Sequence, residues 1–176
     1  MSEGGTKVLL LSASDVDEDV LTYSITAGTN ILSSIDGSTI TFSVIDDDWN
    51  GSEEFTASVT DGEYPQDQTF TVTVEGVNDA PVLAEVSDIT YNEDLSSTLD
   101  LSASDVDEDD LTFSISGGTN IISTLVDSQV TFTSVLDFNG SETFAVSVTD
   151  SEYTDSQIIT VTVNAINDAP SLESIS

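Results

Sequence analysis

The segment Val77-Asn78-Asp79-Ala80-Pro81 recurs as Ile166-Asn167-Asp168-Ala169-Pro170, and the residues between the two copies repeat those before the first. Leu11–Ile25 reads LSASDVDEDVLTYSI, and Leu101–Ile115 reads LSASDVDEDDLTFSI, so these stretches differ at only two positions. A period of about ninety residues is the pattern of one domain repeated in tandem. Because proline fixes its own φ and restrains the residue before it, each Asn-Asp-Ala-Pro segment predicts a short, stiff joint.

This period predicts the domain organisation. We expect residues 1–79 to form a first repeat with a truncated opening strand, and residues 80–168 to form a complete second repeat. Residues 169–176 then begin a further repeat, as in a piece of a longer array.

Within each repeat, short segments alternate apolar and polar residues between turns rich in Gly, Asn, Asp and Ser, which is typical of a β-sandwich. In Phe70-Thr71-Val72-Thr73-Val74, for example, the apolar side chains share one face and the Thr side chains the other. We predict an all-β chain of two tandem seven-stranded Greek-key sandwiches of the cadherin or immunoglobulin type. The expected strands of the first repeat are Val8–Ser14, Leu21–Thr26, Ile31–Ile35, Thr39–Val44, Phe55–Thr60 and Thr69–Val74. Those of the second repeat are Val82–Tyr91, Leu99–Ser104, Leu111–Ser116, Ile121–Leu125, Val130–Ser134, Phe144–Thr149 and Ile158–Val163.

The composition excludes several kinds of partner. The 176 residues include 34 Asp or Glu but a single Lys or Arg and no His, which gives a formal net charge of −33. A nucleic-acid-binding protein needs a basic surface, which this chain lacks, and the sequence offers no run of apolar residues for direct membrane insertion. Without Cys, disulfides and thiolate metal sites are excluded. So many carboxylates oppose compaction unless salt or a divalent cation neutralises them.

Two acidic motifs have the spacing of calcium-binding loops: Asp15-Val16-Asp17-Glu18-Asp19 and Asp105-Val106-Asp107-Glu108-Asp109. An EF-hand loop needs Gly at its sixth position and Glu at its twelfth, where Val20 and Thr26 stand in the first copy. The EF-hand interpretation is therefore rejected, and glycine-rich β-roll repeats are absent as well. A plain alternative is that these Asp residues only form turns.

The alternation of strand directions predicts where the acids gather. Consecutive antiparallel strands alternate between the two ends of a sandwich, so the acids at the far end of the first repeat should meet the joint and the near end of the second. Calcium takes six to eight oxygen ligands and is the expected cofactor. The predicted central set is Glu3, Asp48, Glu53, Asn78, Asp79, Asp105, Asp107 and Asp150. Weaker terminal sites are predicted at Asp15, Asp17 and Asp61, and at Glu93, Glu142 and Asp168.

The order of these motifs resembles the cadherin-like repeats of long bacterial surface and secreted proteins. Asn78-Asp79-Ala80-Pro81 looks like the linker signature of that family, and Asp105-Val106-Asp107 looks like its DxD motif. Glu93 and Glu3 match its early glutamate, and Val148-Thr149-Asp150 resembles its late aspartate motif, as does Val59-Thr60-Asp61. The LDRE-like motif of that family is not intact in this chain, and the segment Asp48–Glu53 stands in its place. The resemblance implies sandwich domains whose junction calcium makes rigid.

The predicted function is therefore mechanical: a calcium-rigidified spacer or adhesion segment of an extracellular or cell-surface bacterial protein, and not an enzyme. Its expected partners are calcium and the neighbouring repeats of the same chain. The alternative is a carbohydrate-binding or homophilic recognition module of a secreted protein, whose partner would be a carbohydrate or another copy. A glycosidase with paired acids is disfavoured, because the acids are duplicated in small domains without the signature of a deep pocket.

Overall fold

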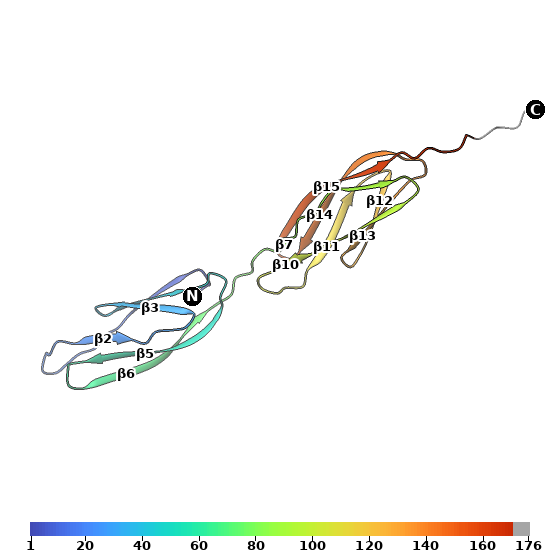
Figure 1. The fold of residues 1–176 in the computed structure, drawn as a ribbon. Coiled ribbons are helices and arrows are strands. Elements are labelled where there is room, and N and C mark those ends of the chain that lie inside the picture. The colour runs from blue at the N-terminus through green and yellow to red at the C-terminus, as the bar shows by residue number, and fades with distance from the viewer. Residues whose placement is uncertain (171–176) are drawn as a thin grey trace, which may run out of the picture. The chain divides into compact units, whose positions relative to one another are not determined.

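The computed structural model describes residues 1–170, and the chain divides into two compact units, Met1–Val77 (unit 1) and Asn78–Ser176 (unit 2) (Figure 1). The division falls two residues before the predicted boundary, because Asn78 and Asp79 hydrogen-bond to side chains of unit 2. Most of the further repeat predicted at residues 169–176 lies outside the described residues. Across residues 1–170, no helix is long and apolar enough to cross a membrane.

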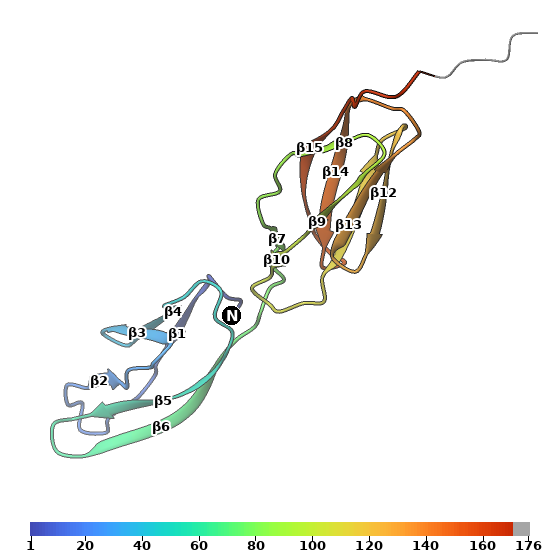
Figure 2. The ribbon, with the colours of Figure 1, turned by 45° about the vertical axis from the view of Figure 1, so that its right-hand side comes forward.

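Unit 1 is built from two three-stranded sheets, drawn as separate layers in Figure 2. One sheet has the order β1-β4-β3 and the other the order β2-β5-β6. The strands are β1 (Thr6–Leu10), β2 (Thr22–Ile25), β3 (Ile31–Asp36), β4 (Thr39–Val44), β5 (Gly51–Thr60) and β6 (Pro65–Val74). All pairings within the two sheets are antiparallel. An isolated parallel bridge between Ser2 and Glu75 adds the first residues to the edge of β6.

The core of unit 1 follows from the alternation of its strands. In β4 every second residue, Ile40, Phe42 and Val44, is buried between the sheets. The Phe42 ring meets the Phe55 ring of the opposite sheet edge to face, with centroids 5.0 Å apart. This aromatic contact joins the two layers.

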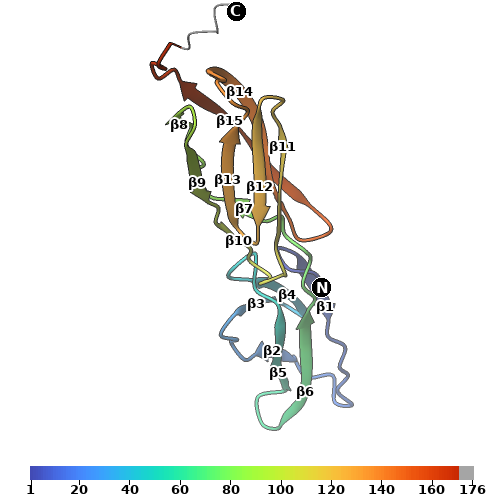
Figure 3. The ribbon, with the colours of Figure 1, turned by 90° about the vertical axis from the view of Figure 1, so that its right-hand side faces the viewer.

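Unit 2 repeats this plan with an additional opening segment. Its strands are β7 (Val82–Leu83), β8 (Ile89–Asn92), β9 (Ser96–Asp100), β10 (Ala103–Ser104), β11 (Thr112–Gly117), β12 (Ile121–Val126), β13 (Gln129–Ser134), β14 (Gly140–Thr149) and β15 (Thr154–Asn164). They form the sheets β12-β13-β9 and β11-β14-β15-β8 and the short pair β10-β7 (Figure 3). The predicted all-β fold of two immunoglobulin-like sandwiches is confirmed.

The predicted strand Val82–Tyr91 is two strands in the structure. β7 pairs antiparallel with β10, whereas β8 pairs parallel with β15 in the other sheet. The chain therefore changes sheets between Leu83 and Ile89, and the predicted strand Leu99–Ser104 is likewise divided between β9 and β10. In unit 1 the counterpart of β8 is a single bridge, between Ser2 and Glu75. No strand formed by residues 1–77 corresponds to β7.

Candidate metal-binding end of unit 2

The pairing of the strands brings three acidic segments to one end of unit 2. β10 and β7 pair Ser104 with Val82, so the loop after β10 lies beside the residues that precede β7. β11 and β14 pair Thr112 with Thr149, so the loop before β11 also lies beside the loop after β14. We call the six residues gathered here the acidic cluster: Asn78, Asp79, Asp105, Asp107, Asp109 and Asp150.

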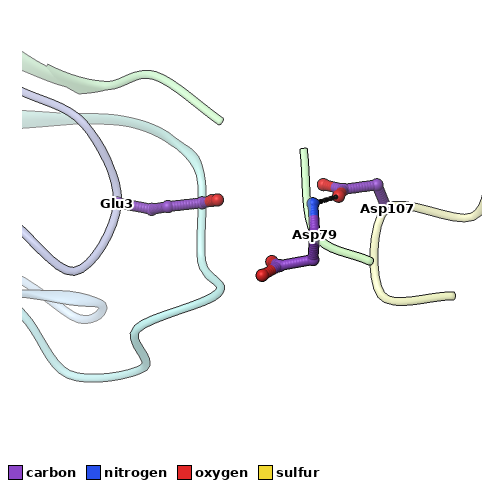
Figure 4. Close-up of side chains that lie close together, drawn as sticks. All are labelled: Glu3, Asp79 and Asp107. Carbon is purple, nitrogen blue, oxygen red and sulfur yellow. Dashed lines mark hydrogen bonds between the residues drawn. The ribbon is translucent and has the colours of Figure 1, made fainter. Parts of the chain in front are cut away.

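Two hydrogen bonds join the segment at the start of unit 2 to the loops of this cluster. The backbone N–H of Asp79 donates to Oδ2 of Asp107 at 2.7 Å (Figure 4). The side-chain amide of Asn78 donates to Oδ2 of Asp150 at 2.8 Å. Each bond has a charged acceptor, which makes it stronger than a bond between neutral groups.

The loop after β10 is organised around Asp105. Its Oδ1 accepts the backbone N–H groups of Asp107 at 2.9 Å and Asp109 at 3.4 Å, and Glu108 between them has a φ of 61°. This turn places carboxylate oxygens of Asp105, Asp107 and Asp109 within 4.8 Å of one another. The other oxygen of Asp105, Oδ2, is buried and has no hydrogen-bond partner among the described residues.

The pKa values at the cluster show its electrostatic strain. Burial raises the pKa of Asp109, and the negative charges of Asp105, Asp107 and Asp150 raise it further. Burial also works to raise the pKa of Asp150, but the hydrogen bonds from Asn78 and from the backbone of Tyr153 and Glu152 bring it below its usual value. The cluster therefore holds several carboxylates close together that repel one another unless a cation lies between them.

The donor set of the cluster fits calcium. It consists of carboxylate oxygens, and calcium prefers oxygen ligands. A buried carboxylate oxygen without a partner costs free energy, and a bound cation would remove that cost. The residues that can supply ligands are Asp105, Asp107, Asp109, Asp79 and Asp150. Of these, Asp109 was outside the predicted ligand set, although its D-x-D-x-D spacing signalled it.

Unit 1 has the same loop, but among the described residues the acids of that loop do not group closely enough to share an ion. Oδ1 of Asp15 accepts the N–H groups of Asp17 at 2.8 Å and Asp19 at 3.2 Å, as in the second repeat. Asp61 accepts the N–H groups of Tyr64 and Glu63, which lower its pKa. Among the described residues, the acid groups close enough to share an ion within a single unit are those of Asp105, Asp107 and Asp109.

Glu3 and Glu93, which lie near the start of the two repeats, each accept a hydrogen bond from the segment by which the chain leaves their own unit. Oε1 of Glu3 accepts the N–H of Val77 at 2.8 Å, and Oε1 of Glu93 accepts the N–H of Ile166. Glu93 is buried, whereas Asp168 beyond it is exposed. Asp48 is exposed in the loop between β4 and β5. The sequence also predicts that acids of unit 1, residues of the joint and acids of unit 2 bind one ion together. This stays a prediction.

Glu53 and Glu142, also predicted as ligands, bind a loop of their own unit. Glu142 accepts the backbone N–H groups of Thr119, Asn120 and Ile121 at 2.7–3.2 Å and the side-chain amide of Asn120 at 3.0 Å. Although burial raises its pKa, these bonds lower it to about 2.

Glu53 makes the same bonds to Thr29, Asn30 and Ile31, and its pKa is lowered for the same reason. Both oxygens of each glutamate are already hydrogen-bonded, so we leave the pair out of the ligand set proposed below. The repeated Gly-Thr-Asn-Ile sequence at 28–31 and 118–121 was the available signal for this role.

Comparisons with known proteins agree with the architecture. The family described as bacterial Ig domain matches residues 1–75 and again residues 78–162. Two solved structures of human protocadherin-24 EC1-2 align with TM-scores of 0.59 and 0.55 at 20% and 17% identity. These alignments cover 92% and 94% of this chain and 88% and 90% of those chains, and at such identity they show the fold alone.

A curated relative is Chitinase A of Pseudoalteromonas piscicida, which is 37% identical over 105 residues. The alignment covers 58% of this chain but only 13% of that protein. The chain therefore spans a small part of the length of this relative.

Proposed function

Because the chain belongs to the bacterial Ig domain family, we propose that it is a calcium-binding, non-catalytic spacer segment of an extracellular or cell-surface bacterial protein. Immunoglobulin-like sandwiches serve mainly as scaffolds, and function is argued from the sites they carry. The site in this chain is the acidic cluster, whose chemistry is that of cation binding.

One observation carries the proposal: Oδ2 of Asp105 is buried without a partner inside a group of carboxylates. Oδ1 of Asp105 already accepts both N–H groups of the loop, so stabilising the turn leaves the buried Oδ2 without a partner. A calcium ion ligated by Asp105, Asp107 and Asp109 gives that oxygen a partner and neutralises the repulsion that raises the pKa of Asp109.

The mechanical consequence follows from the hydrogen bonds of the joint. Asn78 and Asp79 are already bonded to Asp150 and Asp107, so an ion bound by the same carboxylates fixes the joint to unit 2. Fixing these residues removes backbone freedom from the segment between the units. The sequence-based prediction that Glu3 and Asp48 contribute further ligands is part of this proposal.

The test is a calorimetric titration of the metal-free chain with calcium. We expect saturable binding that Asp107→Asn weakens at least tenfold, because a charged ligand is replaced by a neutral one of the same shape. Glu85→Gln is the matched control, since it neutralises an exposed carboxylate outside the cluster. Equal affinities for Asp107→Asn and Glu85→Gln would refute the assigned ligands, and no binding in the wild-type chain would refute the proposal.

The alignment with Chitinase A favours a second candidate, in which the spacer belongs to a secreted enzyme and its own surface binds a polysaccharide. Tyr64 and Tyr153 occupy equivalent loops of the two units and are 67% and 44% exposed, which suits stacking on a sugar ring. Retention of the chain on insoluble chitin, lost in the double variant Tyr64→Ala and Tyr153→Ala, would support recognition. A chain that passes through chitin unretained acts as a spacer alone.

A further inference from the structure

The outermost strand of one sheet in unit 2 carries no charge. β12 lies at the edge of the sheet β12-β13-β9 (Figure 2). The chain has 34 acidic residues, but residues 111–126, which include β12, contain none. An edge strand can pair with a strand of another molecule, and proteins commonly prevent this with charged side chains on the edge. β12 lacks that protection.

The pairing of β12 with β13 shows which backbone groups face outward. The carbonyl of Asn120 accepts an N–H from the residue after β13 at 2.8 Å, and the register continues to the end of β12. Since successive residues of an antiparallel strand turn their N–H and C=O groups to opposite sides, the even-numbered residues of β12 face β13. The N–H and C=O groups of Ser123 and Leu125 therefore face away from it. The N–H of Ile121 also faces away, but Glu142 accepts it, so the free edge begins at Ser123.

The side chains of this edge are complementary to one another. Ile122, Thr124 and Val126 share the outer face of the sheet, and Ile122 and Val126 are 52% and 66% exposed. Consider a second β12 that pairs antiparallel with the first about Thr124. It places Ser123 opposite Leu125, so the outward N–H and C=O groups of the two strands meet. It also places Ile122 opposite Val126 on the outer face, where apolar β-branched pairs stabilise a sheet.

The equivalent strand of unit 1 lacks this complementarity. In β3, Asp36 stands in the place of Val126. The same pairing of two β3 strands would set the carboxylate of Asp36 against Leu32, and removing a charge from water beside an apolar side chain costs free energy. Of these two equivalent strands, β12 is therefore the one that fits a copy of itself.

We propose that β12 binds β12 of a second copy of this chain, antiparallel and about a two-fold axis at Thr124. Such an interface uses the same surface on both molecules and closes as a dimer. Main-chain hydrogen bonds give affinity, and the two pairs of Ile122 with Val126 give the register. One strand on each side makes a smaller contact than a standard interface, so the association is weak. The net charge of −33 on each copy opposes the approach, so association should increase with salt.

The test is NMR spectroscopy of the full, isotope-labelled chain at protein concentrations up to about 1 mM in about 0.5 M NaCl, with chelator to exclude bridging by metal. The amide signals of Ser123 and Leu125 should shift as the concentration rises, because these groups gain hydrogen bonds. The signals of Ser33 and Ile35, at the equivalent edge of β3, should stay in place. Sedimentation velocity of the same samples should show monomer and dimer without larger species. A chain that is monomeric at every concentration would overturn the proposal.

Three variants test the interface. Val126→Asp should abolish the dimer, because it sets a charge opposite Ile122 of the second copy, and it should fold, because Asp36 occupies the same position of β3. Val126→Thr keeps a neutral, β-branched side chain and should still dimerise. Ile158→Asp is the matched control, since it adds the same charge at a side chain that is 78% exposed on β15, in the other sheet. A Val126→Asp variant that dimerises like the wild type, or an Ile158→Asp variant that does not, would refute the assigned interface.

Discussion

The glutamate that accepts four groups of one loop makes a quantitative prediction about stability. Glu142 lies on β14 and accepts the backbone N–H groups of Thr119, Asn120 and Ile121, just where the chain enters β12. In Glu142→Gln the side chain keeps its size but loses its charge, and its NH₂ group must face at least one N–H that it cannot accept. That donor then lacks a partner, so the beginning of β12 should loosen.

The magnitude follows from the pKa of Glu142. A decrease from the ordinary value of 4.5 to about 2 corresponds to about 3.5 kcal/mol at about 1.4 kcal/mol for each pKa unit. Because the side chain is only half-buried, solvent screening reduces this to about 2 kcal/mol. For a domain of about a hundred residues, that free energy lowers the melting temperature by about 8–16 °C.

Differential scanning calorimetry in chelator measures this change. We expect the transition of unit 2 to move to lower temperature in Glu142→Gln and the transition of unit 1 to stay in place. Glu85→Gln is the control and should leave both transitions unchanged, because Glu85 is exposed.

The pH dependence gives the refuting result. Since the folded pKa lies below the unfolded value, the stabilisation by Glu142 is complete above pH 4.5 and is lost as the pH falls towards about 2. The difference between the wild type and Glu142→Gln should therefore shrink across that window. A difference that stays constant from pH 7 to pH 2, or that is absent at pH 7, would show that the charged carboxylate does not hold the loop.

Three further predictions concern unit 2. Leu83→Ala should destabilise it by about 2–5 kcal/mol, because Leu83 fills the core beneath β7, whereas the 60% exposed Val82 should tolerate alanine in the same urea titration. Gly118→Ala should lower its melting temperature more than Gly37→Ala lowers that of unit 1, because both glycines have positive φ but only at Gly118 would a Cβ meet the Phe144 ring, at 2.5 Å. Calcium at a hundredfold excess over its Kd should stabilise it by about 2.7 kcal/mol; equal melting curves in chelator and in calcium would contradict binding to the folded state.

The hairpins of this fold could be predicted from the sequence because alternation and turn residues agree there. The strand Thr39–Val44 was predicted with its observed bounds, and Ile31–Ile35 differs from β3 by one residue. The division of Val82–Tyr91 into β7 and β8 could not be predicted, because a change of sheet leaves the local alternation intact. It depends on partners far along the chain, β10 and β15.

For the site, too, the sequence predicted what depends on local pattern and missed what depends on residues far along the chain. Strand direction predicted that Asn78 and Asp79 lie beside Asp107 and Asp150, and the structure brings these four residues together. The role of Glu142 was missed, because three of its four partners are backbone N–H groups, which carry no signal in side-chain identity, and the repeated Gly-Thr-Asn-Ile sequence does not by itself identify the acceptor. The sequence therefore suggested only a metal ligand at Glu142, and the structure adds the bonds of Glu142 to the loop that precedes β12.

The parallel pairing of β8 with β15 has a consequence for a chain under tension. β8 follows the short β7 near the start of unit 2 and β15 is the last strand of the unit. The two strands pair over four positions, from Ile89 with Val161 to Asn92 with Asn164. Because the strands point the same way, a pull on the two ends of the unit slides one strand along the other. The pull then loads all of the hydrogen bonds at once, whereas an antiparallel pair pulled from one end would open bond by bond. In unit 1 the described residues form a single bridge at this position, between Ser2 and Glu75, so the shear-loaded pairing of unit 2 extends over more positions than that of residues 1–77.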